Sequence, residues 1–167
     1  MANGISVVLP GPLAQHRPFL LNDLPQMIYE MRVRQAFGGQ TVLKMQQKLG
    51  VDPHRFRKVI TDAPACVETS VFLGKASTSV IAGRRRIGVR ATERSGETLV
   101  ELFETKNMVW IVLTVGLLSC FFCAPAAIAV IANMKNSSAN QKVMAQAATA
   151  IKVQYPDAVV SGTVVGA

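Results

Sequence analysis

The sequence contains one long stretch without charge, and this stretch constrains the fold more than any other feature. Residues 108–134 contain no Asp, Glu, Lys or Arg. The hydrocarbon core of a bilayer is about 30 Å thick, and about 20 consecutive apolar residues in a helix can cross it. The segment 108–132 has 25 residues, and only four of them carry a hydroxyl or thiol group. The pattern therefore predicts one transmembrane helix over 107–134.

Two cysteines in this stretch, Cys120 and Cys123, have the spacing of a redox pair or of half a metal site. A thiolate there would face hydrocarbon, which disfavours the charged form. The span contains no His, Asp or Glu that could complete a metal site. Small residues recur at every fourth position instead, which lets a second helix approach closely. We therefore interpret them as a helix-packing face, which comprises Gly116, Ser119, Cys120, Cys123, Ala124 and Ala127.

Basic residues lie on both sides of the predicted span, in a chain with 18 Lys and Arg, 10 Asp and Glu and a net charge of +8. The positive-inside rule therefore gives almost no preference for either orientation of the span. The segment GRRRIGVR (83–90) favours an N-terminal part on the cytoplasmic, matrix or stromal side. Its arginines would also attract anionic lipids or contact a partner, although a solvated, charged edge strand is an equal alternative. These residues are Arg84, Arg85, Arg86 and Arg90.

In the remaining sequence, apolar residues first recur at helical spacing and then at every second position. This change in spacing predicts an α+β fold. The expected order is N-terminal helices, a small antiparallel β-hairpin or sheet, one transmembrane α-helix and a short C-terminal helix. Apolar spacing with Pro and Gly at the ends predicts helices over 25–37, 41–50, 52–62 and 135–154. Alternation predicts strands over 67–73, 77–82, 86–92 and 98–104, the last two joined by a turn at Gly96.

Four consecutive regions follow from these elements. The proline-marked N-terminus predicts an extended arm, and the apolar, β-leaning C-terminal tail is expected to pair with another segment. The expected regions are the arm (1–24), a small extramembrane α+β domain (25–106), the transmembrane helix (107–134), and a C-terminal helix with its tail (135–167).

Residues 41–60 resemble a helix-turn-helix, with a turn centred on Gly50. The resemblance implies a second, basic helix that faces DNA phosphates and base edges. Gln46 stands where the motif usually has a small residue, and an ordinary helical hairpin with a basic face is the plainer alternative. The implied DNA contacts are His54, Arg55, Arg57 and Lys58.

The sequence contains no recognisable catalytic pattern. Its only histidines are His16 and His54, and neither belongs to an arrangement of nucleophile and base. No glycine-rich phosphate loop is present, and no paired carboxylates are suggested. We therefore expect no enzyme activity, no catalytic residue, no cofactor and no metal site.

The arm, the packing face and the apolar tail all require partners, which favours a subunit over an independent protein. We expect a non-catalytic, single-pass accessory or structural subunit of a larger membrane complex. General plausibility suggests an energy-transducing complex (respiratory chain, ATP synthase or photosynthetic), for example in the mitochondrial inner membrane. The expected partners are other transmembrane subunits and anionic lipids rather than nucleic acid. The alternatives are a membrane-anchored helix-turn-helix DNA-binding regulator and a basic lipid-contacting scaffold.

Overall fold

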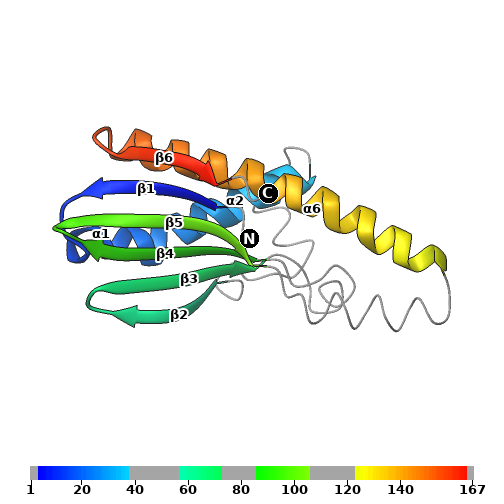
Figure 1. Ribbon diagram of the computed structural model, residues 1–167, viewed down its shortest axis with the longest axis horizontal. Helices are drawn as coiled ribbons and strands as arrows, with labels where there is room; N and C mark the ends of the chain where they lie inside the picture. The colour runs from blue at the N-terminus through cyan, green and yellow to red at the C-terminus, as the bar shows by residue number, and fades with distance from the viewer. Residues whose placement is uncertain (1–3, 38–56, 73–85, 106–122, 165–167) are drawn as a thin grey trace.

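One antiparallel sheet with helices packed on one of its faces makes up the fold in this computed structural model (Figure 1). The structure describes residues 4–37, 57–72, 86–105 and 123–164. Six strands lie side by side in the order β2-β3-β4-β5-β1-β6. The elements in chain order are β1 (Gly4–Pro10), α1 (Leu13–Pro18), the π-helical segment η1 (Phe19–Asp23), α2 (Leu24–Phe37), β2 (Arg57–Ala63), β3 (Cys66–Phe72), β4 (Arg86–Arg94), β5 (Glu97–Thr105), α6 (Cys123–Gln154) and β6 (Val159–Val164).

The hairpin of β4 and β5 lies at the centre of the sheet and confirms the hairpin predicted from the alternation in 86–92 and 98–104. Ser95 and Gly96 form its two-residue turn, with φ angles of 55° and 80°. Positive φ at both turn residues gives a backbone twist that matches the twist of the paired strands. The turn fixes the register, which begins with Arg94 opposite Glu97.

The N-terminal residues differ from the predicted extended arm. Residues 4–10 form β1, which pairs with β5 on one side and with β6 on the other. Its residues Ile5, Val7 and Leu9 are buried, whereas Ser6 and Val8 between them are half-buried. This two-residue period is the signature of a strand with one covered face, and the flanking prolines hid it in the sequence. Residues 13–23 continue as α1 and η1.

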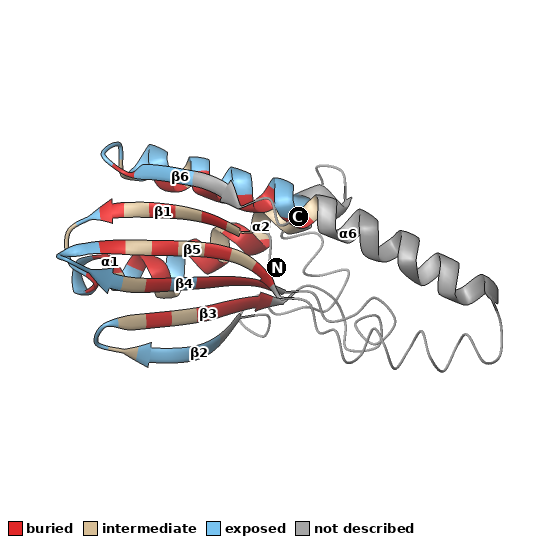
Figure 2. Ribbon diagram, viewed as in Figure 1, coloured by how far each residue is buried: buried red, intermediate tan, exposed pale blue. Residues whose placement is uncertain are grey.

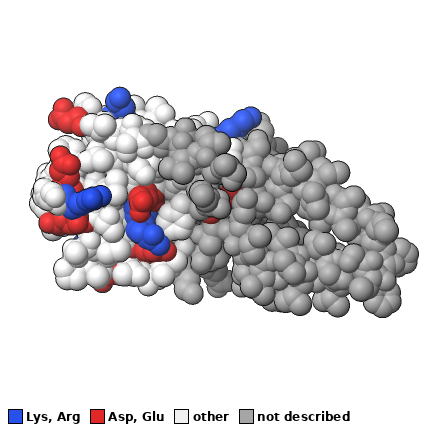
Figure 3. Space-filling model, viewed as in Figure 1, with Lys and Arg blue, Asp and Glu red and all other residues white. Residues whose placement is uncertain are grey.

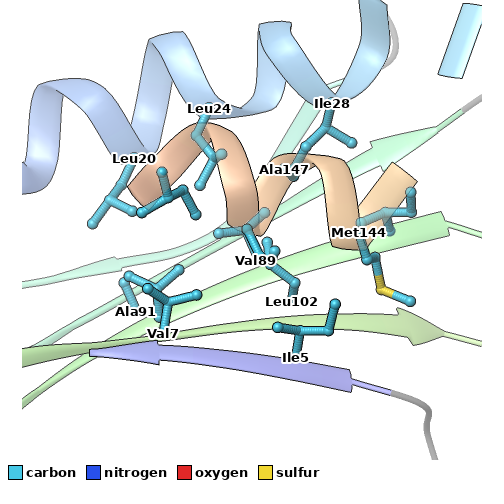
Figure 4. Close-up of a cluster of buried hydrophobic side chains, with 14 of the residues drawn as sticks. Ile5, Val7, Leu20, Leu24, Ile28, Val89, Ala91, Leu102, Met144 and Ala147 are labelled. Carbon is cyan, nitrogen blue, oxygen red and sulfur yellow. The ribbon is translucent and has the colours of Figure 1, made fainter. Parts of the chain in front are cut away.

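Helices α2 and α6, with α1 and η1, cover one face of the sheet, which is called the inner face below (Figures 1 and 4). The described end of α6 presents buried residues at helical spacing, and small alanines let the helix lie close to the strands. Figure 4 shows side chains from β1, β4 and β5 that meet side chains from η1, α2 and α6. The buried residues in this described end of α6 are Asn140, Val143, Met144, Ala147, Ala148 and Ile151.

The helix predictions have mixed outcomes. The helices predicted over 25–37 and 135–154 are confirmed by α2 and by the C-terminal part of α6, which ends two residues before Pro156. The helix predicted over 52–62 is wrong where it is described, because residues 57–63 form β2 and pair with β3. The β-branched run Val59-Ile60-Thr61 favours a paired strand over a helix. The segments predicted over 41–50 and 77–82 lie outside the described residues.

The predicted fold is also wrong in its transmembrane helix. Among the described residues, none of the helices combines the length and the apolar character needed to cross a membrane. Of the predicted span, the structure describes residues 123–134, the first 12 residues of α6. At 1.5 Å per residue these cover about 18 Å of helix. The same helix continues through the polar segment KNSSANQK to the sheet, which the uncharged run alone did not reveal.

A chain of polar side chains joins α2, α6 and β5 near the end of β5. Asn140 Nδ2 donates a hydrogen bond to Glu104 Oε1 (2.8 Å), and Arg32 Nε donates one to Asn140 Oδ1 (2.9 Å). Glu104 and Asn140 are both buried, and desolvation by burial lowers the pKa of Arg32, against the attraction of Glu104. Because buried polar groups need partners, these hydrogen bonds favour one position of α6 over the sheet.

Candidate functional site

The face of the sheet opposite the helices, called the outer face below, carries the candidate site. The strands alternate between buried inner residues and half-buried or exposed outer ones, which appear as red and tan or blue bands in Figure 2. Figure 3 views this face and shows charged side chains in a few small clusters with uncharged surface between them. Half-buried or exposed residues of the outer face are Ser6, Val8, Glu68, Arg90, Thr92, Leu99, Glu101 and Phe103.

Arg90 on β4 is the centre of this site. The sheet register places it directly opposite Glu68 on β3 and Glu101 on β5. Its Nε donates a hydrogen bond to Glu68 Oε2 at 3.0 Å, and its guanidinium carbon lies 5.2 Å from the centroid of the Phe103 ring. The hydrogen bond that Arg90 donates to Glu68 is the largest cause that raises the pKa of Arg90. An exposed guanidinium is thus held in one orientation by a carboxylate and an aromatic ring.

A glycine supports the aromatic ring of the site. Phe103 lies opposite Gly88, and a Cβ atom added to Gly88 would be 2.5 Å from Phe103 Cζ. The ring therefore lies against the backbone of β4, in space that any other residue would occupy. This packing places the Phe103 ring over Gly88 and beneath the Arg90 guanidinium.

The hairpin end of the outer face is hollowed. A shallow, open hollow there combines apolar and charged walls, and its lining consists of Val8, Arg94, Ser95, Glu97 and Leu99. Together with Arg90 and Phe103, the hollow gives this face a mixed surface. Arginine and aromatic side chains with apolar neighbours are the composition found at protein-binding surfaces.

The described residues offer no comparable centre for catalysis. His16 is 2% exposed, and its Nε2 donates a hydrogen bond to the carbonyl oxygen of Pro10 at 2.8 Å. The ring also meets Tyr155 edge to face, with centroids 5.0 Å apart. His16 is therefore a packed core residue of the described region. Among those same residues, no group of three or more His, Cys, Asp or Glu is placed to hold a metal ion.

The structure describes only some of the predicted site residues. Of the four arginines in 83–90, Arg90 lies in the site, Arg86 begins β4 with its side chain not described, and Arg84 and Arg85 lie outside the described residues. Of the proposed DNA contacts, Arg57 and Lys58 begin β2 with side chains not described, and His54 and Arg55 lie outside.

The helix-packing face is likewise described only in part, and no contact between its members is described. Three of its residues fall in the first turns of α6, with side chains not described, and three lie outside the described residues. The former are Cys123, Ala124 and Ala127; the latter are Gly116, Ser119 and Cys120.

Sequence reasoning missed the neighbours of Arg90. The turn at Ser95-Gly96 could have revealed two pairs, since a two-residue turn puts residue 90 opposite 101 and residue 88 opposite 103. Glu68 had no such signal, because β3 and β4 are joined across residues 73–85 and their register has no local mark. No protein-family model, curated protein or solved structure matches this chain.

Proposed function

We propose that this chain is a non-catalytic accessory subunit that binds another protein through the outer face of its sheet. The observation that carries the proposal is the fixed arrangement of Arg90 over Phe103, beside Glu68. Binding energy at protein interfaces concentrates on a few arginine and aromatic residues that are held in place before binding. Arg90 and Phe103 have that character, with partly exposed Val8 and Leu99 on the same face.

Electrostatics favours a protein partner over a lipid surface for this face. Arg90 lies between two carboxylates, Glu68 and Glu101, and its pairs in the sheet offset its charge locally. A mixed cluster of this kind selects a partner with charges arranged to match, whereas an anionic membrane favours an excess of positive charge.

Two other functions expected from the sequence have less support. A DNA-binding helix over 52–62 conflicts with β2, which occupies the described part of that segment. The energy-transducing membrane complex remains a prediction, since no geometry among the described residues depends on it.

The test is native separation of the chain from its source cells, followed by mass spectrometry of the species that contain it. We expect wild type to migrate in a complex larger than a dimer of this chain, with a fixed ratio to its partner. Arg90→Glu should remove the chain from that complex, because it places a third carboxylate beside Glu68 and Glu101.

Lys152→Glu is the matched control, since it makes the same charge reversal at an exposed position on α6. Circular dichroism would establish that both variants are folded. Retention of Arg90→Glu in the complex at the wild-type ratio would contradict the proposal, as would migration of wild type as a free chain or small homo-oligomer.

A further inference from the structure

The two edges of the sheet differ in chemistry. Among the strands that the structure describes, β2 lies at one edge and β6 at the other. An edge strand presents backbone N–H and C=O groups that a further strand can pair with. Both edges also expose valines, with Val59 of β2 at 44% and Val160 of β6 at 41% exposure.

The β2 edge carries the features with which proteins prevent strand pairing. Its sequence RKVITDA contains three charged residues. Arg17 of α1 forms an ion pair with Asp62 and donates a hydrogen bond to the carbonyl oxygen of Ala63 at 2.7 Å. Charges on an edge strand oppose the addition of another strand, because pairing would bring them out of water.

The β6 edge has none of these charges. Its sequence VVSGTV contains no ionisable residue, and Val159 is 61% exposed. Val153, in the last turn of the adjoining helix α6, is 78% exposed. An uncharged strand can pair with an identical strand without repulsion, whereas a charged strand of a partner would find no complementary charge here.

The direction of Val160 shows what a second strand would cover. Val160 lies opposite Val7 of β1, and cross-strand partners point to the same face. Val7 is fully buried under the helices, so Val160 also belongs to the inner face and is exposed because the sheet ends there. A second copy that paired here would continue the sheet and cover the side of Val160 that is now exposed.

We propose that β6 is a homodimer interface, where the β6 strands of two copies pair antiparallel and join the two sheets into one. Two-fold symmetric dimers are the commonest protein oligomers, and an antiparallel pair of identical strands has this symmetry. The surface differs from the outer face around Arg90, so this inference does not depend on the proposed partner binding.

The first test is the mass of the purified full-length chain in solution, measured by sedimentation equilibrium. Wild type should have twice the chain mass of 18.0 kDa. Val160→Lys should weaken the dimer at least about tenfold in dissociation constant, because it places a charge in the covered seam. Val59→Lys is the matched control, since Val59 lies opposite the buried Thr69, on the same face and with similar exposure at the other edge.

A monomeric wild type, or a dimer that Val160→Lys leaves intact, would overturn the proposal. Dissociation by Val59→Lys alone would move the interface to β2 and overturn it equally. Arg90→Glu should leave the dimer intact, which separates this inference from the proposed function.

Hydrogen exchange of wild type gives a second measurement that does not depend on the folding of a variant. Amides of residues 159–161 should exchange more slowly as the protein concentration rises through the dimer range, while amides of residues 59–61 should not change. Exchange in β6 that is independent of concentration would also overturn the proposal.

Discussion

At the scale of single residues, Gly88 illustrates how the outer face depends on a missing side chain. The Phe103 ring occupies the space above this glycine, and Arg90 in turn lies over the ring. The identity of residue 88 therefore affects the position of an arginine two residues further along β4. A glycine inside a strand often marks such a close approach.

Gly88→Ala should destabilise the protein by about 1–3 kcal/mol, because the new methyl group forces the Phe103 ring off the sheet. Chemical denaturation would measure the change in the free energy of unfolding. The same substitution in a Phe103→Ala background should cost much less, since the clashing ring is gone. An equal cost in both backgrounds would contradict the role given to the ring.

The hydrogen bonds of Asn140 give a second prediction about stability. Asn140→Ala removes one hydrogen-bond partner from buried Glu104 and one from Arg32. We expect a destabilisation of about 1–3 kcal/mol in thermal or chemical unfolding. Gln146→Ala, at an exposed position of the same helix, should change stability by less than about 0.5 kcal/mol. Similar effects of the two substitutions would show that the chain of hydrogen bonds contributes little.

The phenol of Tyr155 should make the stability of the protein depend on pH in the alkaline range. Burial, with a smaller effect from Asp23, raises its pKa above the ordinary value of 10.0. The folded state therefore keeps the phenolic proton to a higher pH than the unfolded state does. This contribution to stability is complete below pH 10 and is lost as the pH rises through the folded-state pKa.

The free energy of unfolding should therefore fall more steeply above pH 10 for wild type than for Tyr155→Phe. Denaturation curves at a series of alkaline pH values would measure both slopes. Parallel slopes would contradict the effect of burial at this residue.

At the scale of elements, local signals predicted what local chemistry determines. The β4–β5 hairpin follows from alternation and its turn, and α2 and the end of α6 follow from apolar spacing. The strand β2 was missed because Asp52-Pro53 resembles a helix start, whereas pairing with β3 decides the outcome further along. In the site, the sequence predicted Arg90, and the hairpin turn could also have placed Glu101 opposite Arg90 and Phe103 opposite Gly88. Glu68 was not predictable, because its register with β4 is encoded by no local pattern.

The strand β1 gives the prediction that belongs to this scale. It holds β6 to the rest of the sheet, and three of its side chains are buried in the core. Deletion of residues 1–11 should therefore abolish cooperative unfolding, because it separates β6 from β5 and removes three core side chains. A chain that begins at Gly4 keeps β1 and is the control. Cooperative unfolding of the shorter chain, with a midpoint near that of the control, would contradict this role of β1.

At the scale of the whole molecule, the described fold places its helices on one face and its candidate binding residues on the other. The core between the sheet and the helices stabilises the molecule, and none of the described helices covers the outer face. The transmembrane helix expected from one uncharged run was wrong among the described helices, and composition alone did not show that α6 continues onto the sheet.

The most direct test of the central claim is site-specific photo-cross-linking in the source cells. A photoreactive amino acid at Thr92, on the outer face beside Arg90, should cross-link the chain to one partner protein in a product of defined mass. The same amino acid at exposed Gln146 of α6 should not give that product. An outer face that gives no cross-link, or a product formed equally from both positions, would contradict the claim that this face binds a partner.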